Sequence, residues 1–227
     1  TEIQKQTGWD LISRKKDGFD ITYPFNFDWY LFGFYNHKTN FHSEKWDVIV
    51  NCIANTDTYS KDKQKHFDVN FKGVIDLVDY CNEKDIKLVH ISTEYVYSNN
   101  KLPPSEKDIP IHGKNWYSYT KLLADGYVEA KSEDYLICRC LHKPMDFNHS
   151  YIWDVQTSGD KVDKIAKLII KLINKDAKGI FNVGTGSKQL KEIQESYGAL
   201  ITPPPHVPKD TRMNINKMKS FLDEVQS

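Results

Sequence analysis

A tyrosine followed by a lysine four residues later is the side-chain pairing in this sequence that could do chemistry. On a helix, residues four apart share a face, and a nearby ammonium lowers the pKa of a phenol toward the range used in proton transfer. Five such pairs occur: Tyr59/Lys63, Tyr80/Lys84, Tyr97/Lys101, Tyr117/Lys121 and Tyr127/Lys131. A chain this rich in tyrosine and lysine contains such pairs by chance, so the spacing alone does not identify a site.

Position along the chain selects Tyr117 and Lys121. Tyr117 begins an expected helix directly after a long loop, and that loop follows an expected strand that ends in Ser92-Thr93-Glu94. The other four tyrosines fall late in helices or beside loops, where a solvated tyrosine is ordinary. Ligands bind at the carboxyl ends of parallel strands. We therefore expect Thr93 to hold a substrate carbonyl while Tyr117 protonates it.

The elements that must position these side chains alternate between strand and helix. Short apolar runs predict strands over residues 9–13, 46–53, 87–93 and 135–140. Apolar residues at helical spacing predict a helix through residues 74–81, and a second helix runs from residue 116 or 117 to about 132. Strands that are apolar along their whole length are typical of a parallel sheet covered on both faces. The predicted fold is α/β, with a doubly wound, Rossmann-like sheet.

The pattern changes after residue 141. An irregular segment is followed by a strongly amphipathic helix over residues 162–173, a strand over residues 180–183 and a last helix near residues 215–225. We expect a Rossmann-like dinucleotide-binding domain over residues 1–141 and a small substrate-binding lobe over residues 142–227. A lobe that follows the fourth strand is well placed to cover the crevice at the strand ends.

Composition narrows the classes of partner. The chain has 31 basic and 31 acidic residues, so it lacks the net positive field of a nucleic-acid binder or a polybasic membrane binder. No apolar run approaches the length of a membrane span, and no leader pattern precedes the expected fold. Nucleic acid and membrane are not expected partners. The expected protein is soluble and cytoplasmic.

Cysteine and histidine give no sign of a metal centre. None of the four cysteines forms a C-x-x-C pair, and all lie in apolar runs, which predicts buried, reduced thiols. His142, His149 and Asp146 are irregularly spaced, so we expect no metal site there. His66, His90 and His112 are expected to be structural or solvated. Arginine occurs only at Arg14, Arg139 and Arg212, where a planar guanidinium that donates two parallel hydrogen bonds could be needed.

Two segments resemble a known family. The run HISTEYVY over residues 90–97 and the run YSYTK over residues 117–121 are similar to the extended short-chain dehydrogenase/reductases, in particular the dTDP-4-dehydrorhamnose reductase branch and its nucleotide-sugar relatives. The resemblance covers nearly the whole chain. It is supported by five further segments, residues 48–54, 68–70, 154–158, 182–186 and 208–214.

The resemblance implies an activity and a role for each matching residue. The activity is NAD(P)H-dependent reduction of a 4-keto-6-deoxy nucleotide sugar. Tyr117 would supply the proton, Thr93 would hold the keto oxygen, Lys121 would also hold the cofactor ribose, and Asn70 would support the catalytic residues. The implied substrate-binding residues are Glu94, Gln156 and Arg212. Glu94 stands where the reductases often carry aspartate, which leaves the exact sugar open.

The implied cofactor-binding residues are Arg14, Asp20, Ile21, Asn51, Ala54 and Lys121. Family members choose between cofactors at the position of Arg14. An acidic side chain there binds a ribose 2′-hydroxyl, whereas Arg14 with its neighbouring lysines suits a 2′-phosphate. We therefore expect NADPH, with NADH as the alternative.

One part of the family pattern is missing. The sequence contains no G-x-x-G-x-x-G phosphate loop, and residues 1–6 resemble the helix that such a loop precedes. Because the chain opens at Thr1 rather than Met, we expect a strand and a Gly-rich loop upstream of it. Two alternatives stay open: a non-catalytic regulatory subunit, since the β subunit of methionine adenosyltransferase belongs to this branch, and a nucleotide-sugar epimerase.

The aromatic cluster over residues 23–35 is expected to pack over a sheet edge, or to form the contact of a homodimer.

Overall fold

A four-stranded parallel sheet forms the centre of the molecule, with the strand order β1-β2-β3-β8. Its strands are β1 (Val48–Asn51), β2 (Lys87–Thr93), β3 (Tyr135–Cys140) and β8 (Gly179–Val183). The structure, a computed structural model, describes residues 1–23, 27, 31, 46–101, 103–195 and 198–223. In register, Val89 lies beside Val50 on one side and Leu136 on the other. All four strands therefore end at the same edge of the sheet.

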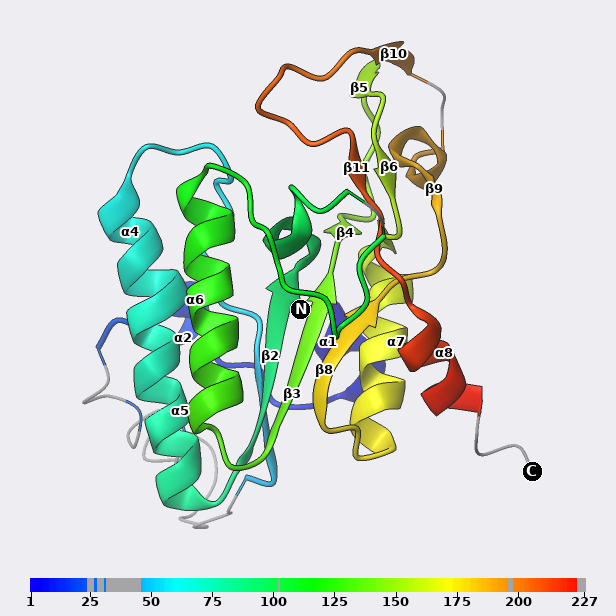
Figure 1. Cartoon of the computed structure of the whole chain (residues 1–227). Helices are drawn as coiled ribbons and strands as arrows, with labels where there is room; N and C mark the ends of the chain where they lie inside the picture. The colour runs from blue at the N-terminus through cyan, green and yellow to red at the C-terminus, as the bar shows by residue number, and fades with distance from the viewer. Residues whose placement is uncertain (24–26, 28–30, 32–45, 102, 196–197, 224–227) are drawn as a thin grey trace.

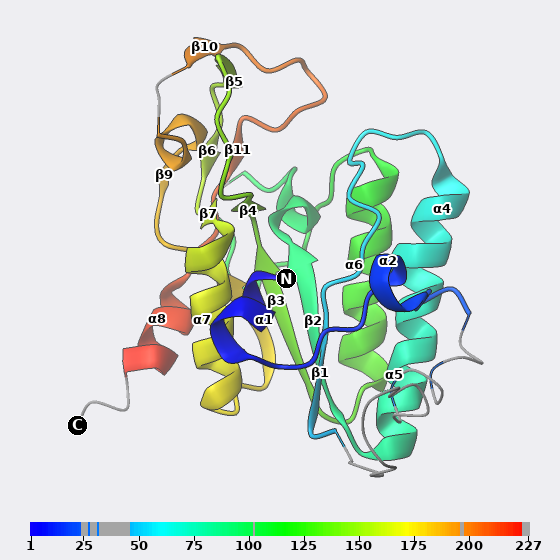
Figure 2. The same ribbon diagram turned by 180° about the vertical axis from the view of Figure 1, so that it is seen from behind.

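Helices cover both faces of this sheet (Figures 1 and 2). One face carries α5 (Gly73–Lys84) and α6 (Trp116–Lys131), and the other carries α1 (Glu2–Thr7), α7 (Val162–Asn174) and α8 (Asn216–Asp223). Neighbouring strand residues point to opposite faces, so Leu88 packs in the α5/α6 core and Val89 packs in the α1/α7 core. Most strand residues are apolar because both faces of the sheet are buried.

The other described elements are short. They are α2 (Arg14–Asp17), α4 (Lys63–Phe67), the π-helical segment Asp68–Lys72, the 3-10 turns Glu94–Tyr97 and Leu190–Ile193, and the strands β4 (His142–Lys143), β5 (Tyr151–Trp153), β6 (Gln156–Thr157), β7 (Asp160–Lys161), β9 (Lys188–Gln189), β10 (Ala199–Ile201) and β11 (Asp210–Thr211).

A small lobe stands above the carboxyl edge of the sheet (Figure 1). It combines the pair β5/β10 with the three-stranded sheet β11-β6-β9, around a core of its own that includes Phe147, Ile152 and Leu190. The chain after residue 141 also contributes α7 and β8 to the central fold, and β8 pairs with β3. The expected division at residues 141 and 142 stays a prediction.

The predicted fold class is confirmed: the chain is α/β with a parallel Rossmann-like sheet. The strands expected over residues 87–93 and 135–140 have these bounds, and the strand expected over residues 46–53 is shorter, at Val48–Asn51. The strand expected over residues 9–13 is wrong, because these residues are in no described strand. Ser13 uses its hydroxyl to cap α2, and its backbone N–H donates to Asp17 Oδ2 at 2.7 Å. That backbone group is therefore not available for a sheet ladder.

The cysteines agree with the expectation only in part. All four are free thiols, and Cys81, Cys138 and Cys140 are buried, but Cys52 is exposed just after β1. A strand end lies at the edge of its sheet, so an apolar run does not guarantee burial there.

Most of the aromatic cluster over residues 23–35 lies outside the described residues, and the homodimer stays a prediction. Among the described helices, none is long and apolar enough to span a bilayer.

Gly184 fits the turn after β8 only because it lacks a side chain. A Cβ at this position would lie 2.3 Å from the Ser158 carbonyl oxygen, whereas a Cβ at Gly126, on the exposed side of α6, would have no other atom within 4 Å. We expect Gly184→Ala to lower the free energy of unfolding by about 1–3 kcal/mol. Gly126→Ala is expected to raise it by about 0.5–1 kcal/mol, since alanine favours a helix. Urea unfolding of both variants checks this, and equal midpoints would contradict it.

Candidate active site

The end of β2 and the start of α6 bring Thr93, Tyr117 and Lys121 together. Asn115 caps α6 by accepting a hydrogen bond from the Ser118 backbone N–H at 2.8 Å, so the helix begins one residue before Tyr117. Thr93 is the last residue of β2, and its hydroxyl accepts a hydrogen bond from the Tyr95 N–H at 3.2 Å. The Thr93 hydroxyl lies close enough to the Tyr117 phenol to lower its pKa. The sequence predicted this grouping.

The pKa of Tyr117 differs from the expectation. Burial raises the pKa of its phenol to about 12, although the hydrogen bond with Thr93 acts in the opposite direction. The expected lowering of this pKa by a neighbouring ammonium is not observed, since the net change is a rise. Loss of solvation outweighs the neighbouring hydrogen bond. Tyr117 is therefore a protonated phenol at neutral pH, which is the form that can give up a proton.

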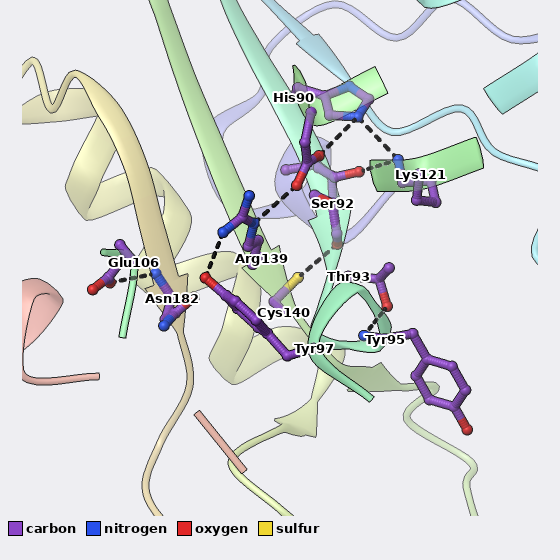
Figure 3. Close-up of polar contacts among 12 residues, drawn as sticks. His90, Ser92, Thr93, Tyr95, Tyr97, Glu106, Lys121, Arg139, Cys140 and Asn182 are labelled. Atoms are coloured by element: carbon purple, nitrogen blue, oxygen red, sulfur yellow. Dashed lines mark hydrogen bonds and ion pairs between the residues drawn. The ribbon is translucent and has the colours of Figure 1, made fainter. Parts of the chain in front are cut away.

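Lys121 is buried inside the fold, with 1% of its surface exposed. Its Nζ lies 2.8 Å from the Ile91 carbonyl oxygen and 3.0 Å from His90 Nε2. Figure 3 shows the contact between Lys121 and His90. Burial lowers the pKa of Lys121 to about 8, and the negative charge of Asp125 opposes this effect. The side chain is thus held in place by β2 before any ligand binds.

Asn70 supports this region from the opposite side. It lies in the π-helical segment Asp68–Lys72, a distortion that is frequent at functional sites. Its Oδ1 accepts a hydrogen bond from the Asn55 N–H at 2.7 Å, and its Nδ2 donates to the Asn55 carbonyl at 3.1 Å and to Thr120 Oγ1 at 3.3 Å. Asn70 therefore joins the loop after β1 to α6, next to Lys121.

The remaining residues assigned to the cofactor lie in two places. Asn51 and Ala54 are at and just after the end of β1, where Asn51 Oδ1 accepts a hydrogen bond from the Ile53 N–H at 3.0 Å. Arg14 begins α2, is largely exposed, and pairs with Asp20 at 3.0 Å. Ile21 is buried on the α5 side of the core. It packs so closely against Gly73 that a Cβ there would lie 2.9 Å from Ile21.

The residues assigned to the substrate meet where the lobe approaches the sheet. Glu94 is fully buried, and neither of its carboxylate oxygens has a hydrogen-bond partner of normal geometry within the described part of the chain. Gln156 in β6 pairs with β11, and its carbonyl accepts a hydrogen bond from the Thr211 hydroxyl. Arg212 forms two close contacts with Asp210 through its guanidinium, at 2.9 and 2.6 Å.

The buried carboxyl of Glu94 makes stability depend on pH. Burial raises its pKa from 4.5 to about 8, and Thr211 and Lys143 offset only part of the rise. The stabilisation from the neutral carboxyl is therefore complete below pH 4.5 and is lost as the pH rises through about 8. We expect Glu94→Gln to remove this loss, which is on the order of a few kcal/mol.

Urea unfolding at several pH values measures this loss. Glu83→Gln is the control, because Glu83 is an exposed carboxylate beside Lys84. The same decline in wild type and Glu94→Gln would contradict the prediction.

Three further residues belong to the site that the sequence analysis did not assign to it: His90, Asp125 and Arg139. Arg139 Nε donates to Asp125 Oδ2 at 2.9 Å and also contacts the Tyr97 hydroxyl, while His90 contacts Lys121 (Figure 3). All three are at most 3% exposed. His90 is expected to be structural or solvated from its sequence, but it contacts the candidate catalytic lysine. The rarity of arginine was the one signal that pointed to Arg139.

The parallel sheet with helices on both faces places the chain among the Rossmann-like α/β proteins. More particularly, the chain belongs to the RmlD substrate binding domain family, whose model matches residues 3–142. A curated relative, dTDP-4-dehydrorhamnose reductase of Mycolicibacterium smegmatis, is 33% identical over 96 residues. That match covers 41% of this chain and 29% of the relative.

Solved structures show the same fold at low sequence identity. A hypothetical dTDP-4-dehydrorhamnose reductase from Sulfolobus tokodaii is 20% identical, with a TM-score of 0.78 over 98% of this chain and 90% of that one. The dTDP-4-dehydrorhamnose reductase of Bacillus anthracis, solved in complex with NADP, is 19% identical, with a TM-score of 0.77 over 96% of this chain and 88% of that one.

Proposed function

We propose that this chain carries the catalytic residues of an NAD(P)H-dependent reductase of a 4-keto-6-deoxy nucleotide sugar, of the dTDP-4-dehydrorhamnose reductase type. The observation that carries the proposal is the grouping of Thr93, Tyr117 and Lys121 at the carboxyl end of β2. Membership of the RmlD substrate binding domain family supports it.

Tyr117 is the proton donor in this proposal. Its phenol is protonated because burial raises its pKa to about 12, so it can transfer a proton to an alkoxide that forms on the sugar. Thr93 holds the same oxygen, since its hydroxyl already reaches Tyr117. Lys121 lies one helical turn further along α6 and stabilises the phenolate left after transfer. The nicotinamide, when bound, supplies the hydride.

The substrate residues are proposed on the lobe side. Glu94 is a buried carboxyl without a partner of normal geometry among the described residues, and this suits it to bind a sugar hydroxyl. Gln156 lies on β6, where it pairs with Asp210 of β11, and Arg212 directly follows β11. In this proposal the lobe binds the nucleotide sugar together with Thr93, Glu94 and Tyr117, and other residues before 142 bind the cofactor.

The residues of the chain fit part of a dinucleotide. Arg14 presents an exposed guanidinium that suits a 2′-phosphate. Asn51 ends β1 and Ala54 follows it, and Lys121 on α6 extends its Nζ to β2. This sequence has no Gly-rich phosphate loop, so its residues include no pyrophosphate cradle of that kind. We propose NADPH as the cofactor, with NADH as the alternative.

Arg14→Ala is expected to reduce the preference for NADPH over NADH by roughly tenfold or more, because a hydrogen bond to a charged group is lost. The measurement is the ratio of kcat/KM for the two cofactors, with Lys5→Ala as the control, since Lys5 is another exposed cation near the N-terminus. An unchanged ratio would show that Arg14 does not contact the 2′-phosphate.

The proposal as a whole is tested by incubating the natural gene product with NADPH and a dTDP-4-keto-6-deoxy sugar. Net oxidation of NADPH supports a reductase. Sugar inversion without net oxidation indicates an epimerase instead. Failure to bind either cofactor in calorimetry favours a regulatory subunit, the alternative that the missing Gly-rich loop supports.

A further inference from the structure

The hydrogen bonds of His90 constrain where its proton lies. His90 is fully buried in β2, and burial holds the pKa of its imidazole well below the ordinary value, so the ring is neutral. A neutral imidazole has one nitrogen that donates and one that accepts. Its Nδ1 lies 3.4 Å from Asn51 Nδ2, and its Nε2 lies 3.0 Å from Lys121 Nζ. Both neighbouring atoms are nitrogens that ordinarily donate.

Asn51 identifies the accepting nitrogen of His90. The orientation of the Asn51 amide is fixed, because its Oδ1 accepts a hydrogen bond from the Ile53 N–H at 3.0 Å. Exchanging its oxygen and nitrogen would break that bond. Its NH2 group therefore faces His90 Nδ1, which must accept. The proton of the ring then lies on Nε2. Asp125 favours the same tautomer, since its otherwise unpartnered Oδ1 lies 3.9 Å from Nε2.

A proton on His90 Nε2 has a consequence for Lys121. An ammonium has three N–H donors and no acceptor, so it cannot accept a hydrogen bond from Nε2–H. A free amine has a lone pair that can accept it, and it still donates to the Ile91 carbonyl at 2.8 Å. The contacts of this structure are therefore satisfied by an uncharged Lys121.

We propose that Lys121 and His90 form a coupled proton switch in which Asn51 and His90 are positioning residues. Lys121 loses one proton to solvent as the proton of His90 moves from Nδ1 to Nε2, and Asn51 holds the Nε2–H tautomer. When Lys121 is protonated, it donates to Nε2, and the bond from Asn51 to Nδ1 is lost. The switch belongs to the ligand-free protein, so it does not depend on the proposed reduction.

Charged groups on several elements face Lys121 and set where the switch occurs. Asp125 on the same helix favours the ammonium. Cys140 at the end of β3 and Cys52 after β1 also face Lys121, but burial raises the pKa of both thiols, so neither is a thiolate where Lys121 titrates. Burial favours the amine and is the largest effect, which places the pKa of Lys121 at about 8. Arg139 neutralises much of the Asp125 charge through its bond to Oδ2. The switch is thus accessible near neutral pH.

Nitrogen-15 NMR of the imidazole and carbon-13 NMR of the lysine Cε test this proposal on the ligand-free protein. Signals are assigned by their absence from His90→Gln and Lys121→Met. We expect His90 to change from Nδ1–H to Nε2–H with the same midpoint as the Lys121 titration. One fixed tautomer of His90 across that titration would overturn the proposal.

Two substitutions of Asn51 sharpen the test. Asn51→Ala removes the donor to Nδ1 and is expected to raise the pKa of Lys121 by up to about one unit. Asn51→Asp places an acceptor beside Nδ1 and is expected to hold His90 as Nδ1–H at every pH. Asn182→Ala is the matched control, since Asn182 is equally buried on β8 and its amide donates to the Pro104 and Asn214 carbonyls. An unchanged or lowered pKa of Lys121 in Asn51→Ala would contradict the coupling.

Discussion

Replacing Tyr117 by phenylalanine is expected to lower turnover of a 4-keto nucleotide sugar by about 10²- to 10⁴-fold, the usual contribution of a general acid. The ring and its contacts with Tyr95 and His66 would remain, so the free energy of unfolding should change little. Only the phenolic hydroxyl is removed, and the loss should therefore fall on kcat rather than on binding of the nucleotide sugar. Steady-state kinetics and urea unfolding of the same preparation measure both quantities.

Tyr119→Phe is the matched control for this prediction. Tyr119 lies two residues further along α6, where its ring packs against Phe67, Trp116 and His112. Tyr119→Phe should keep wild-type turnover. Equal activities of Tyr117→Phe and Tyr119→Phe would remove Tyr117 from the role of proton donor.

Arg139→Met is expected to lower the free energy of unfolding by about 3–5 kcal/mol, because it leaves a buried carboxylate without its cation. Arg139 and Asp125 are 3% and 1% exposed, and their Nε–Oδ2 distance is 2.9 Å. The Tyr97 hydroxyl would lose its guanidinium partner at the same time. Chemical denaturation monitored by tryptophan fluorescence measures the effect.

The control for Arg139 is Arg212→Met. Arg212 pairs with Asp210 with equally short contacts, but its side chain is 34% exposed and that of Asp210 is 42% exposed. Exposed pairs contribute about 0–1 kcal/mol, so this variant should be nearly neutral for stability. If both variants lost little free energy of unfolding, burial would not explain a stabilising effect of the Arg139–Asp125 pair.

Most of the fold followed from local patterns in the sequence. The strands β2 and β3 are rich in apolar and β-branched residues, and burial on both faces of the sheet produces that signal. Residues 9–13 carry a similar signal, but a strand also requires a neighbouring backbone to pair with. Ser13 instead caps α2, and its backbone N–H binds the Asp17 carboxylate. Local pattern cannot reveal which of these two outcomes prevails.

The site could be predicted where its spacing is local. Tyr117 and Lys121 are four residues apart on one helix, and Thr93 ends a strand, so their grouping follows from element geometry. The contact of Lys121 with His90 joins residues 31 positions apart, and that of Arg139 with Asp125 joins residues 14 apart. The raised pKa of Tyr117 depends on how much chain covers it. Such burial becomes visible only in three dimensions.

Transfer of deuterium from labelled NADPH tests the central claim most directly. The natural gene product would be incubated with NADPH deuterated at the transferred position and with a dTDP-4-keto-6-deoxy sugar, and the product would be analysed by mass spectrometry and NMR. The proposed function predicts one deuterium at the former keto carbon, with one NADPH consumed per sugar, and loss of this transfer in Tyr117→Phe. A sugar recovered without deuterium, from protein that binds both ligands, would contradict the assignment of this chain as a reductase.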